Sequence, residues 1–314
     1  MRRPRHCHSV VPRLIVGAIT VVSTTTSLPG QQNMSAPAAV TSVRVRGAEL
    51  HYLDLGHGEP VVFVHGSLGD LETFRPQFDA FSARYRVIAY SRRFHPPNPQ
   101  PPGELIYSAA THADDLAGLI TELRLTRPRV VGLSYGAYTA LIMALRHPDR
   151  IRALVLAEPP LLPFLKGVSG GASFVEDWER LVLEPAQRSF GKGDDEGGLR
   201  LFVGGLRGAG AFDQLPAERR AQLLRYTNAL KLQLLTNRRL YFPTVTCTDL
   251  REIRTPSLLV GGDSSPPMFA RILDELARCL PNPSRVVIPR SGHNMQVDNP
   301  GQFNEQVLTF LNGY

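Results

Sequence analysis

Strand-length apolar runs alternate with helical patterns along most of this chain, and that alternation limits the possible folds more than any other feature. Two short stretches separated by a glycine, "SVRVRG" and "AELHYLDLG", predict a hairpin. Continuous apolar runs predict strands buried on both faces at 60–66, 85–91, 127–134, 151–159, 256–264 and 284–291. Helical spacing lies between them. The pattern therefore predicts an α/β fold, a mostly parallel twisted sheet of about eight strands with helices on both faces.

The alternation stops between residues 160 and 250, where no apolar run of comparable strand quality occurs. Helical patterns fill this block, and one helix is expected to begin at Pro216. The stretch "GKGDDEGG" within the block predicts a solvated loop. The expected division is a core of 41–159 and 251–314, with a helical lid, 160–250, inserted after the sixth strand.

The sequence predicts no metal, no cofactor and no disulfide. Cys7, Cys247 and Cys279 have neither CxxC nor zinc-ligand spacing, so we expect free thiols. The "HCH" at 6–8 lies in a terminus that offers no preorganised outer shell for a metal. Acidic residues at 194–196 would need further ligands that are held rigidly.

The net charge of +7 does not indicate nucleic-acid binding. Residues 1–33 carry four arginines and no acid, and the other basic residues are scattered among acids. A hydrophobic fraction of 43% and a charged fraction of 20% are ordinary for a globular protein. Composition therefore argues against disorder and against a nucleic-acid partner.

The first 40 residues are expected to form a signal-like or disordered extension. A basic start followed by "LIVGAITVV" has the order of a secretory signal, and "APA" at 36–38 offers a cleavage site. Met34 would equally suit the start of a cytosolic enzyme, so cytoplasmic and exported locations both stay open. The apolar run is too short to span a membrane, and no other segment approaches that length.

A serine interrupts one apolar stretch, "GLSYG" at 132–136, where a strand is expected to pass into a helix. Gly132 and Gly136, two positions either side of Ser134, are typical of a sharp turn that brings neighbouring backbone too close for a Cβ atom. The helix that follows places positive potential beside the hydroxyl. Ser134 is therefore a candidate nucleophile.

Other polar residues follow other predicted strands in "HGSLG", "GGD" and "SGH". Serine, aspartate and histidine thus occur in the order Ser134, Asp263, His293, each at the carboxyl end of a parallel strand, where open α/β sheets build their sites. An imidazole can remove a proton from serine, and a carboxylate can fix its tautomer.

These motifs together resemble the α/β-hydrolase family over nearly all of residues 41–312. The resemblance implies Ser134 as nucleophile, His293 as general base and Asp263 as the acid that orients His293. It also implies an oxyanion hole formed by the backbone N–H groups of Ser67 and Tyr135.

Three neighbouring residues have alternative or supporting roles. Glu158 ends the strand 151–159 and is the rival acid or a substrate contact, because members of this fold sometimes place the acid there. His65 is expected to be structural, packing under the oxyanion loop. Asp298 is expected to support the loop that carries His293.

The chain departs from many relatives after its fourth strand, where it reads "YSRRFHPPNP" instead of an aspartate and a glycine-rich turn. We expect this change to leave the three catalytic candidates intact. It is expected to place residues 92–95 near the mouth of the pocket.

The expected function is that of a cofactor-free serine hydrolase, a carboxylic ester hydrolase acting through an acyl-enzyme on a small to medium hydrophobic ester. C–C hydrolase, lyase and perhydrolase reactions use the same three residues and stay open as alternatives, as does a non-catalytic ligand receptor. A serine nucleophile argues against dehalogenase and epoxide-hydrolase chemistry, which use aspartate. The expected partner is a small molecule, and the sequence does not define the oligomeric state.

Overall fold

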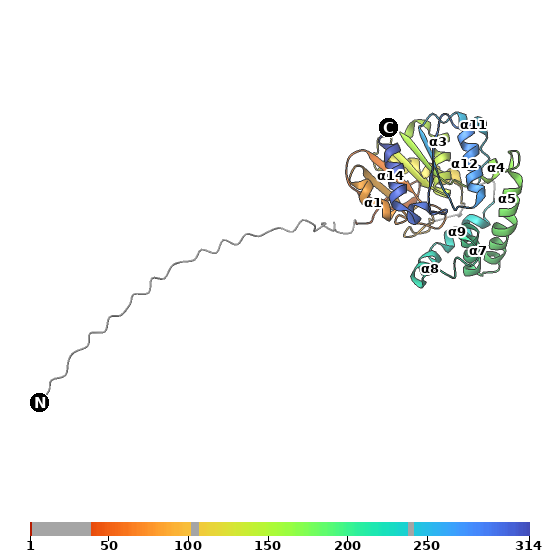
Figure 1. The fold of residues 1–314 in the computed structure, drawn as a ribbon, viewed down its shortest axis with the longest axis horizontal. Coiled ribbons are helices and arrows are strands. Elements are labelled where there is room, and N and C mark those ends of the chain that lie inside the picture. Colours follow the sequence, from red (N-terminus) through yellow and green to blue (C-terminus); the bar gives the residue numbers. More distant parts are fainter. Residues whose placement is uncertain (2–38, 102–106, 238–241) are drawn as a thin grey trace. The chain divides into compact units, whose positions relative to one another are not determined.

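Eight strands form one sheet with the order β1-β2-β4-β3-β5-β6-β7-β8 (Figure 1). The strands are β1 (Thr41–Val45), β2 (Ala48–Leu55), β3 (Pro60–Val64), β4 (Arg86–Tyr90), β5 (Arg129–Leu133), β6 (Ala153–Ala157), β7 (Ser257–Gly262) and β8 (Ser284–Ile288). The pairs β1–β2 and β2–β4 are antiparallel, and every other neighbouring pair is parallel. The predicted strands and the mostly parallel sheet are confirmed. The strand at 284–291 was expected to be buried on both faces, but β8 lies at the edge of the sheet and most of its side chains are exposed, which corrects that expectation.

The structure is a computed structural model that describes Met1 and residues 39–101, 107–237 and 242–314. Of the predicted extension 1–40, residues 2–38 therefore lie outside the described residues, and they include "HCH" and Cys7. Within the described ranges, no helix combines the length and the apolar character that a membrane span requires.

Helices cover both faces of the sheet because successive strand side chains point to opposite sides. One face packs against α1 (Arg75–Ser82) and α14 (Pro300–Leu311), and the other against α2 (Ala109–Glu122), α3 (Tyr135–Arg146) and α12 (Pro267–Cys279). In β3, for example, Phe63 packs on the face covered by α1 and α14, and Val64 packs on the opposite face. Both residues are buried, as the continuous apolar run predicts.

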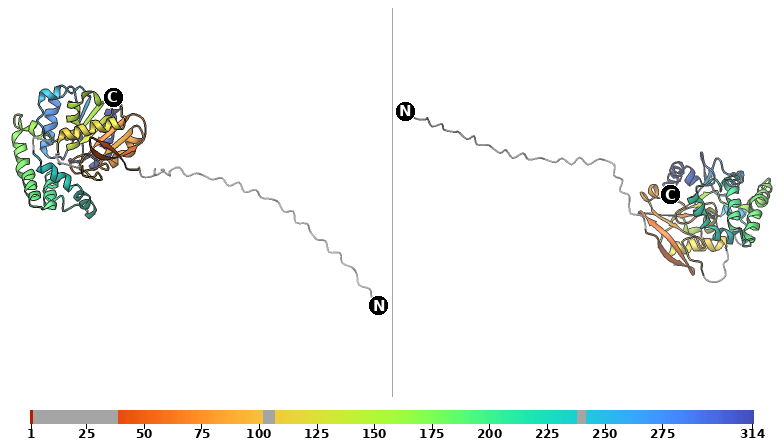
Figure 2. Two further views of the ribbon diagram at one scale, coloured as in Figure 1. Left: turned by 180° about the vertical axis from the view of Figure 1, so that it is seen from behind. Right: turned by 90° about the horizontal axis from the view of Figure 1, so that it is seen from below.

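A helical block occupies the chain between β6 and β7 (Figure 2). It comprises α4 (Leu162–Lys166), α5 (Ala172–Trp178), a π-helical turn (Glu179–Leu183), α6 (Glu184–Gly191), α7 (Asp195–Arg207), α8 (Ala217–Leu224) and α9 (Thr227–Leu235). The helix expected from Pro216 is thus divided between α8 and α9.

The stretch "GKGDDEGG" is mostly helical instead of a solvated loop, which corrects the sequence prediction. The Asp194 carboxylate accepts a hydrogen bond from the Gly197 N–H at 2.9 Å and caps α7, so the acidic residues begin a helix. Asp195 pairs with Lys231 and Glu196 with Arg200. Among the described residues, no group of His, Cys, Asp and Glu could hold a metal ion.

Cys247 and Cys279 form a disulfide, which also corrects the sequence prediction. Cys247 begins α11 (Cys247–Arg251) and Cys279 ends α12, and β7 lies between these helices in the chain. Packing of the two helices brings the Cα atoms to 5.1 Å although 32 positions separate them. Spacing along the sequence carries no sign of this proximity.

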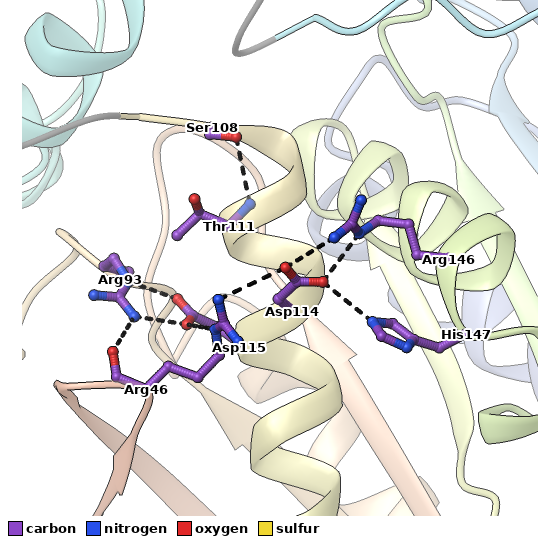
Figure 3. Close-up of polar contacts among 8 residues, drawn as sticks. All are labelled: Arg46, Arg93, Ser108, Thr111, Asp114, Asp115, Arg146 and His147. Carbon is purple, nitrogen blue, oxygen red and sulfur yellow. Dashed lines mark hydrogen bonds and ion pairs between the residues drawn. The ribbon is translucent and has the colours of Figure 1, made fainter.

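Two adjacent acids on α2 tie several elements of the core together (Figure 3). Asp114 accepts hydrogen bonds from Arg146 at the end of α3, at 3.0 Å. Asp115 is buried and forms a bidentate pair with Arg93, in which both nitrogen–oxygen distances are 2.7 Å. Arg46, in the β1–β2 turn, lies within ion-pair distance of both carboxylates. These contacts fix the segment that follows β4.

Candidate active site

Ser134 occupies the sharp turn between β5 and α3. Its φ and ψ of 53° and −123° are a strained conformation for a residue with a side chain. Its N–H donates to the Ala157 carbonyl at 2.7 Å and its carbonyl accepts from the Tyr138 N–H at 3.0 Å, which holds the turn in place. The hydroxyl lies at the carboxyl edge of the sheet, as the sequence predicts.

The two glycines beside Ser134 are required by close backbone approach. A Cβ atom at Gly132 would lie 2.5 Å from the Cα of Ala137, and one at Gly136 would lie 2.0 Å from the carbonyl oxygen of Val64. Neither contact is sterically possible, so the motif "GLSYG" reflects the packing of α3 against β3 and β5.

His293 pairs with Glu158 instead of Asp263. Its Nδ1 lies 2.6 Å from Oε2 of Glu158, and the two side chains are 2% and 1% exposed. The other carboxylate oxygen of Glu158 accepts the Gly262 N–H at 2.8 Å. Glu158 has a φ of 47° directly after β6, so its strained backbone aims the side chain across the ends of β6 and β7. The imidazole of His293 therefore contacts the alternative acid, Glu158, and not the expected Asp263.

Asp263 is exposed and braces the loop before the histidine. Its carboxylate accepts the backbone N–H groups of Arg290 at 2.8 Å and Ser291 at 3.0 Å. These hydrogen bonds, that from Arg290 first, lower the pKa of Asp263. Asp298 accepts the Gly292 N–H at 3.0 Å, which agrees with its expected supporting role. Both acids act on the backbone beside His293, not on its ring.

Ser134 and His293 line one cavity of about 370 Å³. Ser134 is half-buried there, whereas Nε2 of His293 is buried and has no hydrogen-bond partner among the described residues. The Phe269 ring stacks on the imidazole with centroids 4.2 Å apart and limits its rotation. Catalytic hydrogen bonds are often long in empty sites and shorten when substrate binds. The unpartnered ring nitrogen thus belongs to a residue that lines the same cavity as Ser134.

The loop after β3 lies directly beside Ser134. Val64 is paired with Gly132 in the parallel register, so the residues that follow β3 and β5 meet at the same edge. A Cβ atom at Gly66 would lie 3.1 Å from the Cβ of Ser134, and Gly66 and Ser67 both line the cavity. This arrangement agrees with the expected use of the Ser67 N–H as an oxyanion donor. Tyr135, the other expected donor, is the first residue of α3.

The helical block supplies much of the cavity wall. The apolar residues that it contributes are Phe202, Val203, Leu206, Leu215 and Leu223. The polar ones are Arg207, Arg219, Gln222 and Tyr226. The Tyr226 hydroxyl donates to the Asp70 carboxylate at 2.8 Å and joins the block to the loop after β3. A second, apolar cavity of about 30 Å³ also borders Ser134, and Phe202 lines both.

The segment after β4 lies inside the protein, not at the pocket mouth, which corrects the sequence prediction. Arg92, Phe94 and His95 are buried, and Arg93 is half-buried on Asp115. None of these residues lines the cavity that holds Ser134. His65 is buried beneath the loop after β3, where a structural role was expected. No feature of "YSRRFHPPNP" taken alone indicates this burial.

Comparison with known proteins agrees with the geometry. The model of the alpha/beta hydrolase fold family matches residues 59–300. The 2-(acetamidomethylene)succinate hydrolase of Mesorhizobium japonicum is 26% identical over 83% of this chain and 91% of its own length. The carboxylesterase CesB of Bacillus subtilis has a similar structure, with a TM-score of 0.66 at 19% identity over 89% and 93% of the two chains. The meta-cleavage product hydrolase CumD of Pseudomonas fluorescens gives 0.66 at 21% identity over 87% and 97%.

Proposed function

The chain belongs to the α/β-hydrolase fold family, and we propose that it is a cofactor-free serine hydrolase that cleaves a carboxylic ester through an acyl-enzyme. The observation that carries the proposal is the shared cavity of Ser134 and His293, with Nδ1 of His293 held by Glu158 and Nε2 left free. A serine hydroxyl, an imidazole and a carboxylate gathered at one edge of the sheet have little structural use.

The proposed mechanism gives each residue a defined role. His293 Nε2 removes the Ser134 proton as Oγ attacks the ester carbonyl, and Glu158 keeps the Nδ1 proton in place and stabilises the imidazolium. The N–H groups of Ser67 and Tyr135 bind the oxyanion. The imidazolium then protonates the departing alcohol, and a water molecule activated by His293 releases the acid from Ser134.

The cavity dimensions favour a small to medium substrate with an apolar part. About 370 Å³ lies at the lower end of the range for small-molecule sites, and the larger part of the cavity wall is apolar. We propose that the helical block 160–250 acts as the lid over this substrate, because α7 and α8 contribute to the cavity wall.

Labelling with a fluorophosphonate tests whether Ser134 is an activated nucleophile. We expect one equivalent of label on the wild-type chain, none on Ser134→Ala, and strongly slowed labelling of His293→Ala. Ser264→Ala is the matched control, because Ser264 is an exposed serine after β7. Labelling of folded Ser134→Ala at the wild-type rate would overturn the proposal, and complete absence of label and turnover would favour a ligand receptor.

A substrate panel separates esterase activity from the related reactions. Hydrolysis of p-nitrophenyl esters of two to eight carbons in the acyl chain is expected to exceed cleavage of a vinylogous diketone. Preference for the diketone would assign C–C bond hydrolysis to the same residues. Ester turnover that requires hydrogen peroxide would assign perhydrolysis.

A further inference from the structure

Arg92 is a buried cation that has no acidic partner among the described residues. It lies two residues beyond the end of β4 and is 1% exposed. In the described part of the chain no carboxylate pairs with its guanidinium, whereas the adjacent Arg93 is paired with Asp115. Burying an unpaired charge is costly, so the contacts of Arg92 must offset that cost.

The guanidinium binds the loop that precedes Ser67. Its Nε donates to the carbonyl oxygen of His65 and its Nη2 to that of Gly66, both at 2.9 Å. Nη1 donates to the Tyr107 hydroxyl at 2.8 Å. Two of its acceptors are therefore consecutive backbone carbonyls at the end of β3.

His65 adds a second donor to the same Gly66 carbonyl. The backbone N–H of Arg92 donates to Nε2 of His65 at 2.9 Å, so the ring proton resides on Nδ1. Nδ1 then donates to the Gly66 oxygen at 2.8 Å. Burial, and after it the charge of Arg92, holds the pKa of His65 well below its usual value, so the ring stays neutral. The Gly66 carbonyl is thus bound on one side by two N–H groups.

Because the peptide bond is planar, the fixed direction of the Gly66 carbonyl also sets the direction of the Ser67 N–H. The Gly66–Ser67 bond is trans, so the Gly66 C=O and the Ser67 N–H point in opposite directions. The carbonyl is held toward Arg92, which does not line the cavity, whereas Gly66, Ser67 and Ser134 do. The Ser67 N–H is therefore directed to the cavity side.

The side chain of Tyr135, whose backbone N–H is the other expected oxyanion donor, also borders Arg92. The guanidinium carbon lies 5.1 Å from the centroid of the Tyr135 ring, and Tyr135 begins α3. The position of Arg92 is itself fixed. The Asn98 side chain donates to the Arg92 carbonyl at 3.0 Å, and the Arg93–Asp115 pair holds the next residue (Figure 3).

We propose that Arg92 is a positioning residue for the oxyanion hole: it aims the Ser67 N–H into the cavity and places a buried positive charge beside the two residues that carry the donors. This inference rests on the proposed function. A fixed charge in a medium of low polarity favours an anion that forms nearby, and donors set in advance need no reorganisation during the reaction.

Arg92→Met and Arg92→Lys test the proposal, with Arg129→Met as the matched control. Arg129 is also buried, donates to a backbone carbonyl, that of Leu311 at 3.1 Å, and lies 5.0 Å from the Tyr85 ring centroid. It begins β5, whereas Ser134 follows the opposite end of that strand. The two sites are alike in burial and differ in proximity to the oxyanion loop; Arg129 in addition pairs with the exposed Glu59 at 2.8 Å.

We expect Arg92→Met to weaken stabilisation of the transition state without weakening binding of the substrate. For Arg92→Met, kcat on a p-nitrophenyl ester should fall about 10²–10³-fold with KM within about threefold, the range typical of losing one oxyanion donor. A trifluoromethyl ketone mimics the transition state, because Ser134 Oγ adds to it, His293 takes the proton and the ketone oxygen becomes an oxyanion. This inhibitor should bind Arg92→Met more weakly than the wild-type chain by a similar factor. The matching methyl ketone should bind equally well to both proteins. Arg129→Met should change neither kcat nor the ratio of the two inhibition constants.

Folding is checked by circular dichroism and thermal unfolding. If Arg92→Met does not fold, Arg92→Lys decides, because lysine keeps the charge but lacks the planar fork that spans two carbonyls, and a loss of about tenfold in kcat is expected. Wild-type kcat in either folded Arg92 variant, or an equal loss in Arg129→Met, would overturn the proposal. Failure of the wild-type chain to label or turn over would instead remove the proposed function.

Discussion

Replacing Glu158 by glutamine should remove most of the activity while leaving the fold intact. Oε1 of Glu158 accepts the Gly262 N–H at 2.8 Å, and that N–H selects the amide oxygen of a glutamine at this position. The amide NH₂ must then face Nδ1 of His293, where Oε2 now lies at 2.6 Å. Because that NH₂ can only donate, it forces the proton of the imidazole onto Nε2.

The magnitude follows from the tautomer. An imidazole protonated on Nε2 cannot remove the Ser134 proton, and the same change in other Ser-His-Asp enzymes lowers kcat about 10⁴-fold. We therefore expect a loss of about 10³–10⁴-fold in kcat, equivalent to about 4–5 kcal/mol of transition-state stabilisation. KM should change little, because Glu158 does not line the cavity of about 370 Å³.

The assay is steady-state hydrolysis of a p-nitrophenyl ester by Glu158→Gln and by Asp263→Asn. Asp263 is exposed and its carboxylate binds two backbone N–H groups, so Asp263→Asn should retain activity within about fivefold. The reasoning is refuted if folded Glu158→Gln keeps more than a tenth of wild-type kcat. It is equally refuted if Asp263→Asn shows the larger loss.

Three further predictions concern stability and substrate size. Burial, and after it the charge of Arg92, holds the pKa of His65, His95 and His112 well below the usual value. Below about pH 6.5 the unfolded chain therefore binds more protons than the folded chain. The free energy of unfolding should therefore fall as the pH decreases through that value, by up to about 1.4 kcal/mol per pH unit for each histidine. Urea midpoints that do not change between about pH 7.5 and 5.5 would contradict this expectation. Removing the disulfide with Cys247→Ser and Cys279→Ser together should lower the free energy of unfolding by about 3–4 kcal/mol, because the closed loop spans 32 positions. Thiol titration of the denatured wild-type chain before and after reduction checks that the disulfide bond exists. Phe202 lines both cavities beside Ser134, so Phe202→Ala should shift the optimum of kcat/KM toward longer acyl chains, and an unchanged order across the ester series would argue against this assignment of the wall.

The strands and the nucleophile could be predicted because their signals are local. A buried parallel strand requires an apolar run of strand length, and the turn at Ser134 requires glycines where α3 approaches β3 and β5. Both requirements appear within a few consecutive residues. For the same reason Ser67 and His293 could be placed at the edge of the sheet from the strands that precede them.

The acid could not be chosen from the sequence because Glu158 and Asp263 both follow a parallel strand. The choice depends on the φ of 47° at Glu158 and on the Gly262 N–H, which belongs to a strand about a hundred residues away. The disulfide and the burial of Arg92 are likewise products of packing between distant segments. Each could be seen only when the chain was folded.

Trapping the acyl-enzyme would show whether Ser134 is the residue that attacks the ester. Acid quench of the wild-type chain within milliseconds of mixing with a p-nitrophenyl ester, followed by peptide mass mapping, should find the acyl group on the peptide that contains Ser134, together with a burst of about one equivalent of p-nitrophenol. An acyl group on any other residue, or full turnover by folded Ser134→Ala, would contradict the account.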